Sequence, residues 1–249
     1  MTFWRISTAA RSVRVAIEGA YSGESAFLVG GSPKLLQLDL RLLKLPGCWS
    51  MAINNASVII EPNAMIAVDT SKCFNANIFS NSRVLKLFTY SRHSEIISGK
   101  RLCLYPNTLF FDVQDETQLM MSEFCRLDGP LPFWRVTFFT ALACLYQLGF
   151  KEVYLLGCTF DTQGYAHGQE IRESDKTFND EVHDETVKYL TALMPMLRDE
   201  GMLVKTCHEN TALTGIVDYI SFYDAVSCVV SKSTNVEFGP LRHKSEFEK

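Results

Sequence analysis

The segment from residue 133 to residue 157 constrains the fold of this 249-residue chain more than any other. Five apolar side chains recur at helical spacing over residues 133–148. They are Phe138, Ala141, Leu142, Leu145 and Leu148. Gly149 follows where a helix C-cap is expected, and residues 152–156 form a nearly all-apolar run closed by Gly157. A helix, a glycine and a buried strand in this order indicate a parallel sheet covered by helices.

Further short apolar runs, separated by polar connectors, predict the other strands. They span residues 26–29, 50–53, 56–60, 65–68, 84–90, 102–105, 109–113 and 202–206. A second helix is expected over residues 180–199, kinked at Pro195 because proline removes a backbone donor. The pattern predicts an α/β fold, with a Rossmann-like, mostly parallel sheet flanked by helices. We expect one domain over residues 1–230, with a lid-like insertion at 161–180 and a polar tail at 231–249.

Composition narrows the class of protein further. With 47% hydrophobic residues the chain can bury a large core, and a net charge of -4 without a basic stripe argues against a nucleic-acid partner. No apolar run approaches the ~20 residues of a transmembrane helix. Eight cysteines are scattered without a CxxC pair, which predicts buried thiols in a reducing, cytoplasmic setting and no zinc site.

The first seventeen residues are unusual because they hold arginines and no acid. Arg5, Arg11 and Arg14 alternate with Ser and Thr, a composition that also suits an organellar transit peptide. We favour a surface helix before the first strand.

Polar residues that follow predicted strands are the candidate ligand contacts, because open α/β sheets bind ligands at the carboxyl ends of their strands. Gly30, Gly31 and Ser32 form a turn before Pro33, where backbone amides and a helix dipole favour a phosphate. The alternative is a tight turn that merely requires glycine.

Three further side chains end predicted strands in the same way. Asn54 and Asn55 have amides that suit a base or a phosphate, or they form a simple turn. Asp69 suits a ribose hydroxyl or a leaving group, or it caps the next helix. His208 and Asn210 follow the last predicted strand.

Two histidines are candidates for proton transfer. His183 lies at the start of an acidic helix after the long polar loop, and a neutral imidazole can take a proton from an acceptor hydroxyl. An exposed helix histidine is the alternative interpretation. His167 lies within the loop itself and is a second candidate, as part of a lid.

Four segments, taken in order, carry a resemblance to a known family. They are GGSPKLLQLD at 30–39, INNA at 53–56, VTFFTALACLYQLGFKEVYLLGCTFD at 136–161, and the acidic helix from His183 followed by ENTAL at 209–213. Together they resemble the bacterial sialyltransferases of glycosyltransferase family 42 and the related motility accessory factor and MptE-like proteins. Thr137 and Phe138 replace the family's Ser-Gly pair, and Thr159 replaces its aspartate, with Asp161 two positions later.

The resemblance implies transfer of a sugar, such as a sialic-acid-type sugar, from a nucleotide-activated donor to the hydroxyl of a glycan or protein acceptor. By that match His183 is the general base, the 30–32 turn with Asn54 or Asn55 holds a CMP-like nucleotide, and Asn210 lies on the nucleotide side. Thr137 and Asp161 occupy further donor-binding positions, with Asp69 beside them. The resemblance also implies a homo-oligomer and no obligatory metal or other cofactor.

Two alternatives stay open at the level of sequence. The MptE-like relatives transfer diphosphate, which would require Mg²⁺ held by carboxylates such as Asp69, Asp161 and Asp184. The other alternative is a nucleotide or nucleotide-sugar binding protein that has lost catalysis, which suits the replacements at Thr137, Phe138 and Thr159.

Overall fold

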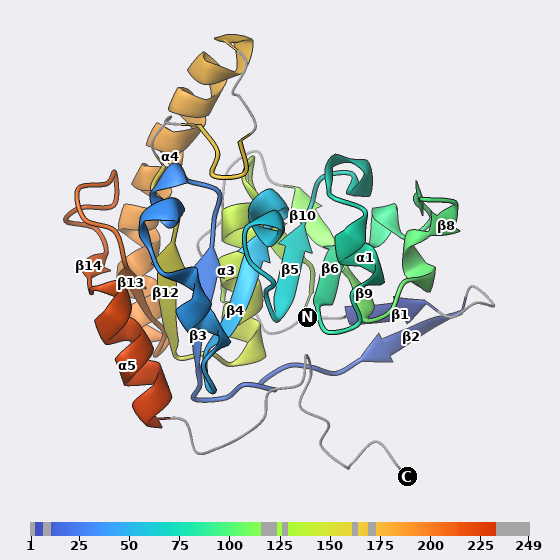
Figure 1. The fold of residues 1–249 in the computed structure, drawn as a ribbon, viewed down its shortest axis with the longest axis horizontal. Coiled ribbons are helices and arrows are strands. Elements are labelled where there is room, and N and C mark those ends of the chain that lie inside the picture. Colours follow the sequence, from blue (N-terminus) through green and yellow to red (C-terminus); the bar gives the residue numbers. More distant parts are fainter. Residues whose placement is uncertain are drawn as a thin grey trace.

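A computed structural model describes residues 3–6, 11–115, 124–125, 129–160, 164–168 and 173–232, with the side chains of 115 and 173–179 excepted. Its centre is a ten-stranded sheet, in the order β14-β13-β12-β3-β4-β5-β6-β9-β1-β2 (Figure 1). The strands are β1 Phe3–Ile6, β2 Ser12–Val15, β3 Ser25–Val29, β4 Trp49–Ile53, β5 Ala64–Ala67, β6 Leu85–Thr89, β9 Thr108–Phe111, β12 Glu152–Leu156, β13 Leu203–Thr206 and β14 Asp218–Tyr219.

The remaining elements are helices and two small sheets. The α-helices are α1 Asn77–Ser80, α3 Thr137–Leu148, α4 Glu173–Asp199 and α5 Phe222–Lys232. The 3-10 helices are η1 Pro33–Gln37, η2 Leu40–Lys44, η3 Asn54–Val58, η4 Ser71–Cys73, η5 Tyr90–Arg92 and η6 Leu102–Leu104. The small sheets pair β7 Ile96–Ile97 with β8 Lys100–Arg101, and β10 Val113–Asp115 with β11 Leu131–Phe133. Within the described ranges, no helix is long and apolar enough to cross a membrane.

The main sheet is parallel from β14 to β9, and only β1 and β2 are antiparallel. After β3 the chain runs through β4, β5, β6 and β9 on one side, and it later returns to β12 on the other side of β3. The strand order therefore reverses between β3 and β12. In doubly wound sheets a ligand crevice forms outside the carboxyl ends of the strands at such a switch point.

Both faces of the sheet are buried, which explains why most residues of the central strands are apolar. Along β3, Ala26 and Leu28 pack in the core that contains α3 and α4. Phe27 and Val29 alternate with them and pack in a second core with η1 and α5. These contacts confirm the predicted α/β fold with a mostly parallel sheet flanked by helices.

Most predicted elements are present, with shifted ends. Residues 152–156 form β12 as predicted, and Gly149 ends α3 in the left-handed region with φ 93°. The helix predicted over 133–148 begins at Thr137, because residues 131–133 pair with β10. The helix predicted over 180–199 already begins at Glu173 and continues through Pro195. The predicted lid segment is therefore helical from 173 onward, while 161–163 and 169–172 lie outside the described residues, as does the tail from 233.

Two strand predictions were wrong. Residues 56–60 belong largely to η3, because Asn54 has φ 51° and its carbonyl accepts a bond from Ser57 Oγ at 3.0 Å. Such local bonds replace a strand ladder. Residues 102–105 hold η6, where Tyr105 N–H bonds to the carbonyl of Leu102 at 3.2 Å.

The surface helix expected in the first seventeen residues was also wrong. Residues 3–6 and 12–15 are instead paired antiparallel strands, and β1 pairs with β9 through Phe3 and Phe111. Phe3 is completely buried by this pairing. The burial that favours a strand at residues 3–6 thus depends on β9, which lies about a hundred positions away in the sequence.

Candidate active site at the strand switch point

The turn after β3 lies in direct backbone contact with the end of β12. Gly30 N–H donates to the carbonyl of Leu156 at 2.7 Å, and Ser32 N–H donates to the carbonyl of Gly157 at 3.0 Å. A Cβ atom on Gly30 would lie 2.5 Å from the Gly157 oxygen and 2.8 Å from Cys158 Sγ. Gly30 is therefore required by the close approach of two chain segments, whatever ligand the turn holds.

Gly31 is covered by the segment that carries His167. Its carbonyl accepts a bond from Ala166 N–H at 2.8 Å, and a Cβ on Gly31 would lie 3.2 Å from the ring of Tyr165. His167 stacks near Tyr165, with ring centroids 5.2 Å apart. The described part of the predicted lid, residues 164–168, thus lies on the glycine turn.

The helix after this turn differs from the expected one. η1 is a 3-10 helix of five residues, and Ser32 Oγ caps it by accepting from Lys34 N–H at 3.3 Å. So short a helix has little dipole to offer a phosphate. The cation at this position is Lys34, whose Nζ donates to the carbonyl of Asn210 at 3.0 Å. The backbone carbonyl of Asn210 therefore lies within reach of the Lys34 side chain. Lys34 was missed because nothing in the sequence links positions 34 and 210.

Asn54 and Asp69 come together at the ends of the neighbouring strands β4 and β5. Asn54 Nδ2 donates to Asp69 Oδ2 at 3.3 Å. Asn54 Oδ1 is buried and has no hydrogen-bond partner among the described residues. Asn55 points elsewhere, since its Nδ2 donates to the carbonyl of Cys73 at 3.4 Å. Asp69 is not the helix cap, because Thr70 occupies the N-cap position of η4.

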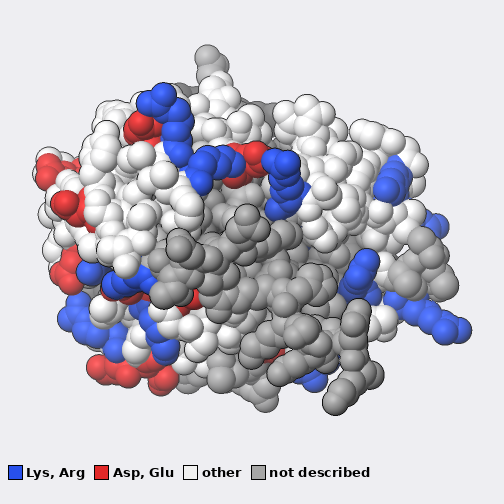
Figure 2. Space-filling view, turned by 60° about the horizontal axis from the view of Figure 1, so that its bottom comes forward, with Lys and Arg blue, Asp and Glu red and all other residues white. Residues whose placement is uncertain are grey.

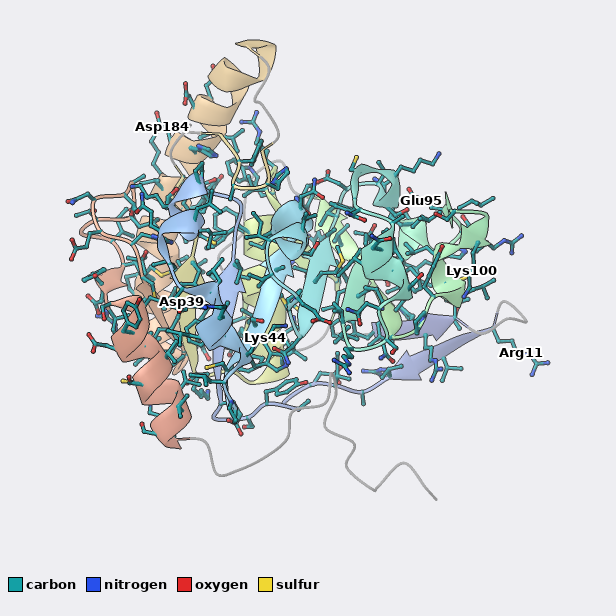
Figure 3. The ribbon with its side chains drawn as sticks, viewed as in Figure 1. Arg11, Asp39, Lys44, Glu95, Lys100 and Asp184 are labelled. Atoms are coloured by element: carbon teal, nitrogen blue, oxygen red, sulfur yellow. The ribbon has the colours of Figure 1, made fainter. Side chains whose placement is uncertain are left out.

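A partly buried carboxylate, that of Glu95, holds the loop that follows Asp69 (Figure 3). It accepts bonds from Thr70 Oγ1 at 3.0 Å, from Ser71 N–H at 2.7 Å and from Ser71 Oγ, and it pairs with Arg92 at 3.2 Å. Burial alone would raise the Glu95 pKa, but these hydrogen bonds and the guanidinium hold that pKa below its ordinary value. Glu95 thus fixes the backbone beside Asp69, a role that its sequence position does not reveal.

His183 reaches the same edge through aromatic contacts. Its ring packs edge-on against Phe160, with centroids 5.8 Å apart, and Phe160 packs against Phe138 at 5.0 Å. Phe160 follows the end of β12, and Phe138 lies beside the buried Thr137 at the start of α3. Arg135 Nη1 also pairs with Glu185 Oε2 of α4 at 2.9 Å. The start of α3 and the part of α4 that carries His183 are thereby held together.

His208 stabilises the segment that follows β12 through a hydrogen bond. It is 7% exposed, and its Nε2 accepts a bond from Gly157 N–H at 2.8 Å. In a neutral imidazole the proton then lies on Nδ1. The strand-end position of His208 was noted from the sequence, and the structure gives it a positioning role.

The carboxylates considered for a cation are dispersed where the structure describes them. Asp184 is exposed on α4, whereas Asp69 lies at the end of β5 (Figure 3). Asp161 lies outside the described residues. Over the described ranges, no three His, Cys, Asp or Glu side chains are grouped as a metal ion would require.

A cavity of about 340 Å³ lies elsewhere, beside η3. Its polar lining is Ser57, Glu61, Asn75, Asn77 and Asn81. Since none of the predicted site residues lines it, this cavity is separate from the switch point.

The protein has an α/β fold with a mostly parallel sheet, and the candidate site lies where the strand order reverses between β3 and β12. Searches against protein-family models, curated proteins and solved structures give no match for the chain.

Proposed function

We propose that the chain is a glycosyltransferase-like enzyme, which transfers a sugar from a nucleotide-activated donor to an acceptor hydroxyl. The observation that carries the proposal is the meeting of two groups of residues at the end of β12. His183 contacts Phe160 just after that strand, and Ser32 of the glycine turn bonds to Gly157 at the same strand end. A proton acceptor and a candidate phosphate seat therefore share one edge.

The nucleotide is assigned to the edge formed by β3, β4 and β5. Lys34 supplies positive charge for the phosphate that departs with the nucleotide. Within the 30–32 turn the N–H donor is that of Gly31, because the amides of Gly30 and Ser32 already donate to the carbonyls of Leu156 and Gly157. Asn54 Oδ1 needs a donor, which the exocyclic amine of cytosine or a ribose hydroxyl provides. Since every nucleotide carries a ribose hydroxyl, the choice of a CMP-linked donor and a sialic-acid-type sugar rests on the resemblance to the sialyltransferases.

In the proposed reaction the acceptor oxygen attacks the anomeric carbon of the donor sugar. The bond from that carbon to the nucleotide oxygen breaks, and the nucleotide keeps the electron pair. His183 takes the proton of the acceptor hydroxyl. Lys34 neutralises part of the charge that develops on the phosphate.

One observation favours a second candidate, a nucleotide-binding protein without turnover. Phe138 is 4% exposed, and Phe160 packs against both its ring and that of His183. This aromatic packing fills space on one side of the imidazole that an acceptor would otherwise approach. The diphosphokinase alternative has no comparable support, since among the described residues no contact joins Asp69 to Asp184.

A thermal-shift screen against CMP, UMP, GDP, ATP and their sugar conjugates tests nucleotide binding, which both candidate functions require. A ligand at a hundred times its dissociation constant stabilises the folded state by ~2.7 kcal/mol, which shifts the melting temperature measurably. We expect a shift with CMP or a CMP-linked sugar. The absence of a shift with every nucleotide would overturn the assignment of this edge. Release of free CMP in the presence of acceptor then separates the enzyme from the binder.

A further inference from the structure

One end of the molecule, defined by two hairpins, is distinct from the switch-point edge. The hairpins are β1 with β2 and β7 with β8, and they project together at the end of the sheet away from β14 (Figure 1). Ser12 Oγ of β2 lies 2.9 Å from the hydroxyl of Tyr90, and Tyr90 packs against Trp4 of β1. Because Tyr90 opens η5, which leads into β7, the two hairpins form one structural unit.

This end gathers exposed cations, and we call it the basic end. Its members are Arg5, Arg11 and Arg14 of the first hairpin, and Lys100 and Arg101 of the second. Arg11 and Lys100 both point outward there (Figure 3). Toward the right-hand end of the space-filling view, the visible charged side chains are Lys and Arg (Figure 2).

The described carboxylates nearest these hairpins are already engaged. Glu18 pairs with Arg14 at 3.8 Å, Asp112 accepts from Trp4 Nε1 at 3.4 Å, and Glu95 is held by Arg92 and its loop. Neither Arg5 nor Arg101 forms an ion pair with another described residue. The basic end therefore carries an excess of positive charge, although the whole chain has a net charge of -4.

Exposed aliphatic side chains lie among these cations. Val13 is 56% exposed and pairs in register with Arg5. Ile96 is 61% exposed and pairs in register with Arg101. A tight turn with φ 48° at Ser98 and 79° at Gly99 presents the second hairpin. Each hairpin thus offers an aliphatic group beside a guanidinium.

We propose that the basic end docks the protein peripherally on an anionic lipid surface. Lys and Arg near such a surface are attracted by its negative potential, and aliphatic side chains gain by entering the boundary between headgroups and acyl chains. A nucleic acid satisfies the cations but offers no hydrocarbon to Val13 and Ile96, and recognition of its single strands relies on exposed aromatic platforms. The aromatic rings of Trp4 and Tyr90 at this end are only partly exposed and pack on each other. The combination of positive charge and exposed aliphatic groups therefore favours an anionic lipid surface over a nucleic acid as the partner.

Co-sedimentation with vesicles tests the proposal. The wild-type chain is expected to bind phosphatidylcholine vesicles that contain phosphatidylserine, to leave pure phosphatidylcholine vesicles unbound, and to be released by high salt. Lys100→Glu with Arg101→Glu should lower the partition coefficient at least about tenfold, because each charge near the surface contributes to attraction. Lys151→Glu with Lys188→Glu makes the same change in net charge at the residue before β12 and on α4, and should leave binding nearly unchanged.

A second variant tests the aliphatic contribution without changing charge. Val13→Ser with Ile96→Ser should weaken vesicle binding severalfold, and both side chains are exposed enough for the fold to be kept, which circular dichroism verifies. The proposal is overturned if the wild type does not bind anionic vesicles at low salt, or if the two charge-reversal double variants lower vesicle binding equally. It is also overturned if single-stranded RNA binds while anionic vesicles do not.

Discussion

Gly157 N–H donates to Nε2 of His208 across 2.8 Å, joining the end of β12 to the end of β13. The same Gly157 accepts from Ser32 N–H through its carbonyl, and it has φ 62°. One peptide segment is therefore held from both sides by a histidine and by the glycine turn. This arrangement makes His208 a positioning residue for the proposed phosphate seat.

Replacing His208 should destabilise the protein through this one bond. In His208→Phe the buried Gly157 N–H loses its acceptor, which costs about 1–3 kcal/mol. For a domain of this size that lowers the melting temperature by several degrees. His208→Gln keeps an acceptor on its side chain and should lose less. Equal melting temperatures for His208→Phe and the wild type would show that the bond contributes nothing.

The two glycines of the turn should respond differently to alanine. Gly30→Ala places a Cβ against backbone, 2.5 Å from the Gly157 oxygen, and overpacking of this kind costs about 1–3 kcal/mol. Gly31→Ala meets only the ring of Tyr165 at 3.2 Å, and a side chain can move. Urea unfolding of the two variants measures the difference. A larger loss in Gly31→Ala than in Gly30→Ala would contradict the packing argument.

Nucleotide binding should depend on Asn54 and not on Asn55. Asn54→Gly removes the amide and accepts the φ of 51° without strain, so the change isolates the side chain. We expect the dissociation constant for CMP, measured by calorimetry, to rise about tenfold, which corresponds to a lost hydrogen bond of about 1.4 kcal/mol. Asn55→Ala is the matched control, because its amide bonds to the Cys73 carbonyl. If both variants bind CMP like the wild type, the nucleotide lies elsewhere.

Substitution of His183 separates the enzyme from the binder. His183→Gln should reduce the rate of sugar transfer by a factor of about 10² to 10⁴ while CMP affinity is kept, because only proton transfer is removed. His93→Gln is a control at a histidine whose Nδ1 lies 2.8 Å from the carbonyl of Tyr90, away from the switch point. A rate unaffected by the His183 change, measured as CMP released, would exclude the histidine as base.

Much of the fold was predictable because strands that are buried on both faces consist mostly of apolar residues, and such runs can be recognised in a single sequence. Residues 153–156 are apolar and buried for that reason, and the strand over 152–156 was placed correctly. The β1–β2 pair was missed because its burial depends on β9, and four-residue strands carry little pattern of their own. Residues 56–60 were wrongly predicted as a strand because local hydrogen bonds, which hydrophobic patterning does not show, decide the conformation of this segment.

The site was predictable only in part, for a related reason. Asn54 and Asp69 follow neighbouring strands, so their meeting could be expected from strand ends alone. The roles of Lys34 and Glu95 could not, because their partners at Asn210 and Ser71 are brought close only by the folded chain. A single sequence therefore locates the edge of the sheet, while the groups that support it emerge from tertiary contacts.

Because Lys86 is buried, the free energy of unfolding of the protein should change with pH in the alkaline range. Its side chain is 0% exposed, and Nζ donates to the Asn81 carbonyl at 2.6 Å. Burial lowers the Lys86 pKa from 10.5 to about 8, so between these values the unfolded chain binds a proton that the folded chain does not. Stability contributed by this residue therefore rises with pH through that window, and below it the buried charge costs up to about 3 kcal/mol.

Comparison with Lys86→Met isolates this contribution, since other titrating groups are common to both proteins. We expect the variant to be more stable than the wild type at neutral pH, and its advantage to shrink as pH rises above about 8. Lys188→Met, at an exposed lysine of α4, is the control and should track the wild type at every pH. Free energies of unfolding from urea titrations across this range supply the measurement. An advantage of Lys86→Met that stays constant with pH would mean that the lysine keeps an ordinary pKa in the folded protein.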